Sequence, residues 1–311
     1  APKEWWLPYT DPSFMCSAYD NMHASWSSTH EETWDVVKHN DFVGGQFIWT
    51  GFDYIGEPTP YAYPARSSYF GIIDLAGLPK DSYYMYQSEW TSKDVLHLFP
   101  HWNWLPGQAI DMWCYYNHAD EVELFVNGKS QGVRRKTVYG AKNEGKAFEK
   151  STEYHVMWRV NFEPGEVKVV ARKNGKQVGE QIIRTAGAPH HLVLKKTYQG
   201  YQAFGASEPT TFVEVNVVDK EGNLCPNAEN QIFFSVIGEK AGEEAGEEAS
   251  AGFDEKAGLK ILGTDNGCQT SLERFTDPHR KAFFGKCIVV LKGKGTLKAQ
   301  AIDLKDATLS L

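Results

Sequence analysis

The chain has 311 residues, 41% of them hydrophobic, and a formal net charge of −8 at pH 7. This much apolar material suffices for two or three domains with buried cores, whereas the negative charge argues against binding to nucleic acid or to an anionic membrane surface. No apolar run approaches the roughly 20 residues of a membrane-spanning helix, and residues 1–15 lack the basic and apolar regions of a signal peptide. We therefore expect a neutral or polar substrate, no nucleic-acid partner and no membrane contact.

Two helices are predicted in residues 1–91. Ser28 or Thr29 can cap the first helix, because a glutamate follows either residue at the third position, and its pattern runs to Lys38. The second helix is predicted for residues 81–90.

A strand and a long loop are predicted between these helices. The nearly continuous apolar run at 44–50 is typical of a strand buried on both faces of a parallel sheet. Residues 52–68 form a loop rich in Pro, Gly and Tyr. This α/β pattern is that of one end of a (β/α)8 barrel, in which the loops after the strands build the active site. About 90 residues cannot close such a barrel, so we expect residues 1–91 to be the end of a larger domain that begins upstream.

After residue 92 the apolar pattern changes to strict alternation, which predicts β-strands. Asn127-Gly128 and Asn174-Gly175 are hairpin turn signals. The clearest predicted strands are 109–116, 121–126, 166–171, 211–218, 231–236, 287–291 and 297–302. We expect an all-β part made of two immunoglobulin-like β-sandwich domains, at 92–186 and 187–311.

Cysteine spacing and acidic composition indicate no further site. The five cysteines show no zinc-ligand spacing, so we predict no metal site and no cofactor. Free, partly buried thiols are expected, although a disulfide between Cys268 and Cys287 stays open. The stretch at 238–258 is rich in Glu, Ala and Gly, which is typical of a solvated insertion.

The densest group of chemically useful side chains is the segment that contains Trp49, Asp53 and Glu57. Cleavage of a glycosidic bond needs two carboxyl groups that flank the sugar. Asp53 and Glu57 could supply such a pair, but neighbouring carboxylates in a loop more often make structural hydrogen bonds, and Arg66 is available nearby.

A set of longer segments carries a specific resemblance. They are CSAYDN (16–21), THEETW (29–34), GQFIWTGFDYIGEPTP (45–60), SSYFGIIDLAG (67–77), YQSEW (86–90), HLFPHWNW (97–104) and EVELFVNGK (121–129). In this order they resemble glycoside hydrolase family 2, of the β-galactosidase type. The resemblance covers essentially the whole chain.

The resemblance implies a retaining mechanism with two glutamates, an acid and a nucleophile, on barrel strands that precede this chain. We therefore assign no catalytic residue here, and expect the chain alone to be inactive. Where more distant relatives place a glutamate after a cysteine, this chain has Ser17 after Cys16, so the nucleophile role is not transferred.

The resemblance also implies a substrate pocket. Trp49 resembles the tryptophan that forms the floor under the galactose ring, and Asp20 is a candidate partner for a sugar hydroxyl. Asp53 and Glu57 are expected to hold the loop, with Glu57 a candidate substrate contact. The full set of candidate substrate-binding residues is Trp49, Trp26, Asp20, Asn21, Asp53 and Glu57.

Two alternatives stay open. The chain could be a carbohydrate-binding or assembly module, with Trp102, Trp104, Trp113 and Tyr115 as an exposed glycan platform. It could also be a self-sufficient hydrolase that uses Asp53 and Glu57 as its two carboxyl groups. On the main interpretation, its partners are a carbohydrate substrate and the upstream part of the same enzyme. Assembly into a homo-oligomer is left open, and the resemblance suggests a periplasmic or secreted location.

Overall fold

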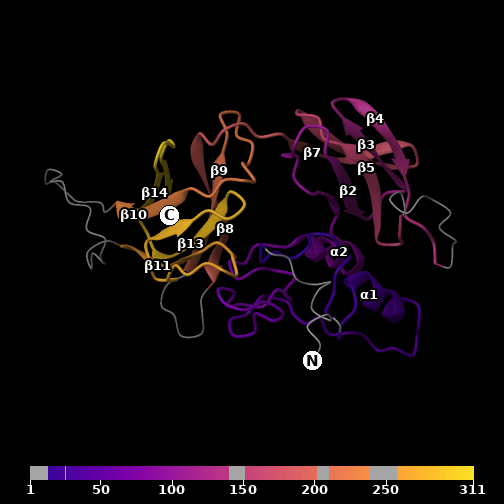
Figure 1. The fold of residues 1–311 in the computed structure, drawn as a ribbon, viewed down its shortest axis with the longest axis horizontal. Coiled ribbons are helices and arrows are strands. Elements are labelled where there is room, and N and C mark those ends of the chain that lie inside the picture. The colour runs from indigo at the N-terminus through magenta and orange to yellow at the C-terminus, as the bar shows by residue number, and fades with distance from the viewer. Residues whose placement is uncertain (1–12, 25, 140–150, 202–209, 238–257) are drawn as a thin grey trace, which may run out of the picture. The chain divides into compact units, whose positions relative to one another are not determined.

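The protein forms two compact units, residues 1–185 and residues 186–311. The computed structural model describes residues 13–24, 26–139, 151–201, 210–237 and 258–311 (Figure 1). Separate hydrophobic cores occur in the two units. Helix accounts for 7% and strand for 42% of the structure, so the protein is nearly all β.

The helices and strands have the following bounds. The first unit contains α1 (His30–Lys38), α2 (Asp81–Trp90), β1 (Leu96–Phe99), β2 (Ala109–Tyr116), β3 (Glu121–Val126), β4 (Lys129–Arg134), β5 (His155–Asn161), β6 (Glu166–Lys173) and β7 (Lys176–Arg184). The second contains β8 (His191–Tyr201), β9 (Thr210–Val218), β10 (Gln231–Ile237), β11 (Leu259–Asp265), β12 (His279–Lys281), β13 (Lys286–Gly293), β14 (Thr296–Ala301) and β15 (Ala307–Ser310). Neither α1 nor α2 has the length and hydropathy needed to cross a membrane.

Both predicted helices are confirmed. Thr29 Oγ1 accepts a hydrogen bond from Glu32 N at 3.2 Å, and the Glu32 carboxylate accepts one from Thr29 N at 3.0 Å. These reciprocal bonds form a capping box at the start of α1 and satisfy donors that the first helical turn leaves free.

The strand predicted at 44–50 is not formed, which corrects the expected α/β pattern. Phe47 is fully exposed, and backbone pairing begins only where residues 50–53 run parallel to residues 70–73. A strand requires neighbouring backbone to pair with, and an apolar run cannot supply it. Within the described residues up to 91, the chain has two helices and isolated bridges but no strand.

A β-sandwich follows in the first unit. Its sheets have the orders β1-β2-β5 and β4-β3-β6-β7, with every pairing antiparallel. The predicted hairpins are confirmed: Asn127, Gly128, Asn174 and Gly175 all have positive φ, as turns that match the strand twist require. Side chains from both sheets, including Leu124 and Trp158, form a core between them.

Strand β2 is buried on both faces. Met112, Cys114 and Tyr116 point into the sandwich core, whereas Trp113 and Tyr115 point outward into a second core shared with α2. Helix α2 accordingly packs against β1 and β2; Figure 1 shows α2 beside β2. The glycan-platform alternative is wrong for these residues, because Trp113 and Tyr115 are buried, as is Trp102.

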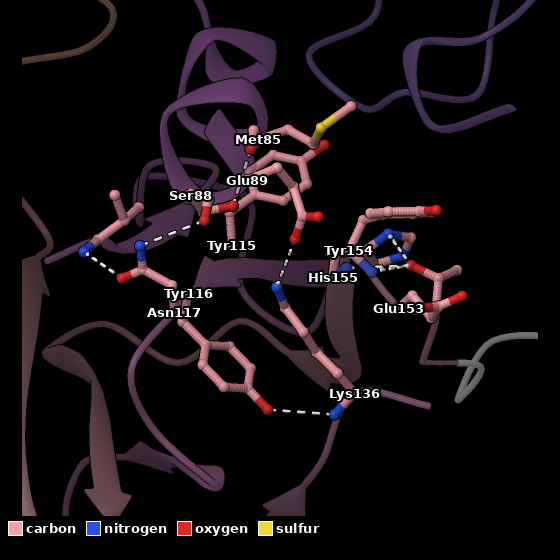
Figure 2. Close-up of polar contacts among 12 residues, drawn as sticks. Met85, Ser88, Glu89, Tyr115, Tyr116, Asn117, Lys136, Glu153, Tyr154 and His155 are labelled. Atoms are coloured by element: carbon pink, nitrogen blue, oxygen red, sulfur yellow. Dashed lines mark hydrogen bonds and ion pairs between the residues drawn. The ribbon is translucent and has the colours of Figure 1, made fainter. Parts of the chain in front are cut away.

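Polar contacts reinforce the packing of α2 against the sandwich (Figure 2). Lys136 Nζ lies 3.4 Å from Glu89 Oε1 of α2, and the Lys136 backbone N–H donates to Tyr116 Oη at 3.1 Å. Asn117 Nδ2 donates to the Ser88 carbonyl at 3.2 Å. The helices are thus fixed to the sandwich by ion pairs and hydrogen bonds as well as by apolar packing.

The second unit is also a two-sheet β-sandwich. Its sheets have the orders β12-β10-β14-β15 and β11-β13-β9-β8, and apolar side chains of both sheets form one core. All five cysteines are free, so the disulfide between Cys268 and Cys287 is not formed. The acidic stretch predicted at 238–258 lies, apart from its last residue, outside the described residues.

Candidate functional site

The candidate site is built on a loop that begins with a parallel backbone pairing. Thr50 N donates to Phe70 O at 3.0 Å, and Ile73 N donates to Gly51 O at 3.0 Å. Gly71 permits this close approach: a Cβ there would lie 2.1 Å from the backbone nitrogen of Asp53. The pairing fixes the backbone from which the loop side chains project.

Asp53 holds this loop from the inside. Its side chain is fully buried, and its carboxylate lies 2.8 Å from Lys80 Nζ and accepts a hydrogen bond from Gly71 N at 2.8 Å. A buried carboxylate with these partners is a structural anchor, because reaching a substrate would break an ion pair in a region of low dielectric. The alternative of a self-sufficient hydrolase requires Asp53 as one of its two carboxyl groups, so the burial of Asp53 argues against it.

Trp49 and Glu57 are brought together through Tyr54. Trp49 Nε1 donates to Tyr54 Oη at 3.1 Å, and Tyr54 Oη donates to Glu57 Oε2 in a short hydrogen bond. The Trp49 side chain remains 72% exposed, and its ring meets that of Tyr54 edge-on. Burial, and then the Glu57 carboxylate, raise the pKa of Tyr54. The chain thus presents an open indole face in an orientation fixed by two polar contacts.

Asp20 lies at the N-terminus of α1. Its two carboxylate oxygens accept hydrogen bonds from His30 N at 2.9 Å and Glu31 N at 2.7 Å, where the helix leaves N–H groups unpaired. Burial raises the pKa of this carboxyl. Asp20 therefore holds the start of α1, a contact that the sequence analysis did not predict. The next residue, Asn21, is exposed, and its Oδ1 accepts a hydrogen bond from Ser17 Oγ at 2.9 Å.

Three residues beside Asp20 were missed by the sequence analysis. His30 Nδ1 lies 3.0 Å from Tyr86 Oη, and Gln46 Nε2 donates to the same oxygen at 3.3 Å. Burial lowers the pKa of His30, so its imidazole is neutral near pH 7. His30 and Gln46 both lie inside the segments that carry the family resemblance, and this position was the only indication in the sequence that they belong to the site.

Apolar side chains are exposed along residues 42–63. Trp26, the remaining candidate residue, is also exposed, at 53%. Six large apolar side chains are exposed within this short segment, and exposed apolar surface of this kind is typical of a site that binds other protein or ligand. The exposed apolar residues of this stretch are Phe42, Phe47, Trp49, Phe52, Ile55 and Tyr63.

One group in the described part of the chain brings three metal-ligand side chains close enough together to hold a metal ion. It consists of Asp35, His39 and Glu153 and lies where α1 meets the start of β5. The sequence analysis did not find it, because Glu153 is far from the other two residues in the chain.

Several known proteins that the chain is similar to are named as glycosidases. Residues 107–179 match a domain family of unknown function, DUF4982. The chain is 53% identical over its whole length to a β-galactosidase, BoGH2A, of Bacteroides ovatus, and 34% identical over 92% of its length to a putative β-glucuronidase of Formosa agariphila. It spans 33% of the first relative and 25% of the second.

Solved structures agree with these relatives. The structure of a β-glycosidase from Bacteroides vulgatus matches the whole chain with a TM-score of 0.77 and 32% identity, and the chain covers 35% of it. A glycosyl hydrolase family 2 member from Bacteroides cellulosilyticus matches 90% of the chain with a TM-score of 0.67. The chain covers 36% of that protein, and at 24% identity this second likeness supports the fold alone.

Proposed function

The chain belongs to glycoside hydrolase family 2, and from this premise we propose that it forms the C-terminal part of a retaining enzyme of the β-galactosidase type. The whole enzyme would hydrolyse terminal β-galactosides in oligosaccharides or polysaccharides. In this proposal residues 1–91 form the end of a (β/α)8 barrel. Residues 92–186 and 187–311 are two immunoglobulin-like domains. The relative from Bacteroides ovatus, a β-galactosidase that matches the whole chain, supports this assignment.

The exposed Trp49 indole is the observation that carries the proposal. An aromatic face can stack on the C–H face of a sugar ring, and such a platform acts best when its orientation is fixed in advance. Tyr54 fixes it here by accepting a hydrogen bond from Trp49 Nε1, and Glu57 holds Tyr54 by accepting one from Tyr54 Oη. In this proposal Trp49 is the floor of the galactose subsite, and Trp26, Asn21 and Glu57 line its edge.

The two catalytic carboxyl groups are proposed to come from the upstream part of the enzyme. A retaining glycosidase needs an acid and a nucleophile about 5–5.5 Å apart, flanking the bond that is cleaved. Asp53 is buried against Lys80, and Asp20 caps α1. Neither carboxylate is open to a substrate, so we assign both to positioning the loop and the helix that surround the subsite.

The exposed apolar stretch at 42–63 supports the same arrangement. In this proposal the upstream barrel strands cover its aromatic and aliphatic side chains and pair with residues 44–50. The predicted strand would therefore form only in the longer protein. A carbohydrate-binding or assembly module is less well supported, because the sandwich aromatic residues Trp102, Trp113 and Tyr115 are buried.

Two proteins test the proposal: the chain alone and a chimera with the upstream part of a relative. The purified 311-residue chain is first incubated at high concentration with p-nitrophenyl β-galactoside, β-glucuronide and β-mannoside, and we expect no turnover. The chain is then joined to the upstream two thirds of the Bacteroides ovatus β-galactosidase, replacing the corresponding part of that enzyme. We expect this chimera to release p-nitrophenol from the β-galactoside.

Variants of the chimera test the subsite. Trp49→Ala is expected to lower kcat/KM by about 100-fold or more, because the sugar loses its platform in the transition state as well as in the ground state. Tyr198→Ala, which removes an exposed aromatic ring from the second unit, serves as the control and is expected to leave kcat/KM unchanged. Turnover by the chain alone that Glu57→Gln abolishes would refute the proposal, and so would a folded chimera without galactosidase activity.

A further inference from the structure

Three metal-ligand atoms meet where α1 joins the sandwich of the first unit. Asp35 lies on α1 and His39 is the residue that caps its C-terminal end, one turn further on, so both lie on the same side of the helix end. Glu153 lies two residues before β5. His39 Nε2 lies 2.7 Å from Glu153 Oε2 and 3.8 Å from Asp35 Oδ1. The three ligand atoms all lie within 4.8 Å of one another.

This arrangement has more acceptors than the imidazole can satisfy. His39 Nε2 carries at most one hydrogen, which can bond to Glu153 but not also to Asp35 at 3.8 Å. A divalent cation in place of that proton would bind all three atoms. Ligand atoms about 2.0–2.2 Å from a tetrahedral zinc ion lie roughly 3.4 Å apart, so small side-chain rotations suffice.

The surroundings hold the three side chains in place. Tyr154 Oη donates to Asp35 Oδ1 at 2.8 Å, and the His39 ring stacks on Tyr139 with centroids 3.8 Å apart. Contacts of this kind orient ligands and strengthen metal binding. Lys38 Nζ also faces the group, 3.6 Å from Glu153 Oε1, but its shorter ion pair is with Glu89 at 2.9 Å. The other Glu153 oxygen remains directed at His39.

We propose that Asp35, His39 and Glu153 bind one Zn²⁺ ion, with water completing the coordination, and that the ion joins α1 to the start of β5. One imidazole and two carboxylates suit zinc, whereas Mg²⁺ and Ca²⁺ prefer oxygen ligands alone. Because two ligands come from the helix and one from the sandwich, the ion binds only when the first unit is folded and therefore stabilises it. The inference stands independently of the proposed glycosidase function.

Isothermal titration of the chelator-treated chain with ZnCl₂ tests the site. We expect one equivalent to bind, and Glu153→Gln and His39→Gln each to weaken binding by more than about tenfold. His118→Gln is the matched control: His118 also pairs with a carboxylate, Asp94 at 2.7 Å, but in an exposed position that does not belong to the metal-ligand group. It should leave zinc binding unchanged, and MgCl₂ should not compete.

Thermal unfolding provides a second measurement that separates lost binding from lost folding. All ten tryptophans lie between residues 5 and 158, so tryptophan fluorescence reports the first unit alone. Zinc should raise the midpoint for the original chain and for His118→Gln but not for Glu153→Gln, which can keep a hydrogen bond to His39 and should fold. The proposal is overturned if no stoichiometric binding occurs, if binding survives both ligand substitutions, as binding to thiols would, or if Mg²⁺ binds equally well.

Discussion

Glu31 of α1 and His155 of β5 form a buried hydrogen-bonded pair, with Glu31 Oε1 2.5 Å from His155 Nδ1. The other Glu31 oxygen accepts from Thr152 Oγ1 at 3.0 Å, and the His155 ring stacks on Trp113 with centroids 3.6 Å apart. The pair spans 124 residues of sequence and lies beside the core shared by the helices and the sandwich. It therefore couples the folding of the two parts of the first unit.

Glu31→Ala should lower the free energy of unfolding of the first unit by about 3 kcal/mol. The substitution leaves the buried His155 imidazole and the half-buried Thr152 hydroxyl without their carboxylate, and breaking a buried pair costs more than the pair itself contributes. Urea unfolding followed by tryptophan fluorescence measures the effect. The control is Glu32→Ala on the same helix, which removes only an exposed capping contact and should cost about 1 kcal/mol or less. Equal losses would show that the buried pair is not coupled to folding.

Asp53→Asn should destabilise the first unit by about 2 kcal/mol, because Lys80 loses its charged partner while the loop keeps a side chain of the same shape. The same urea titration measures it. Glu57→Gln is the control on the same loop: its side chain is exposed, so stability should change by no more than about 0.5 kcal/mol. A stability loss confined to Glu57→Gln would reverse the roles assigned to the two residues.

Gly71→Ala should disrupt the pairing between residues 50–53 and 70–73. The added Cβ would lie 2.1 Å from Asp53 N and 2.4 Å from the Phe52 carbonyl carbon, and backbone cannot yield as a flexible side chain does. Hydrogen exchange at Ile72 and Ile73 should become faster, since their amides donate across this pairing. Gly44→Ala, where no atom lies within 4 Å of the added Cβ, should leave exchange unchanged. Normal protection in Gly71→Ala would show that the loop is held elsewhere.

Local sequence patterns predicted the elements whose partners are close in the chain. Residues 121–126 alternate as predicted, with Val122, Leu124 and Val126 buried, because the hairpin turn at Asn127 fixes the register of β3 and β4. The capping box of α1 was likewise predictable, since such a helix start is set by residues within one turn. The bounds of α2 also agree with the prediction, although no side chain caps its start.

Contacts between distant segments were not predictable. Asp20 was expected to bind a sugar hydroxyl, but α1, ten residues further on, presents unpaired N–H groups to it. Residues 44–50 have the composition of a buried strand, yet a strand forms only beside paired backbone. The metal-ligand geometry of Glu153 likewise depends on how α1 packs on the sandwich. Of the candidate residues, the sequence therefore identified Trp49 and Glu57 as neighbours, but not the Tyr54 hydroxyl that links them.

The last prediction concerns Asp219, at the end of β9 in the second unit. Burial alone would raise the pKa of this carboxyl. Hydrogen bonds from the Asn223 side chain and from the backbone N–H groups of Gly187, Asn223 and Glu221 outweigh burial and lower the pKa below its ordinary value of 3.8. A carboxyl whose folded pKa is lowered contributes stability above its unfolded pKa, and that contribution is lost as the pH falls through the folded value.

Asp219→Asn should therefore lower the stability of the second unit by about 1–3 kcal/mol at pH 7, and the difference from the original chain should shrink as the pH falls below about 4. The second unit has no tryptophan, so its transition is the one seen by calorimetry or circular dichroism without a change in tryptophan fluorescence. Asp303→Asn, a substitution in the same unit at an exposed turn, should show no such pH-dependent difference. If the Asp219→Asn difference is the same at pH 3 and pH 7, the carboxylate charge is not what holds this turn, and the hydrogen bonds act through shape alone.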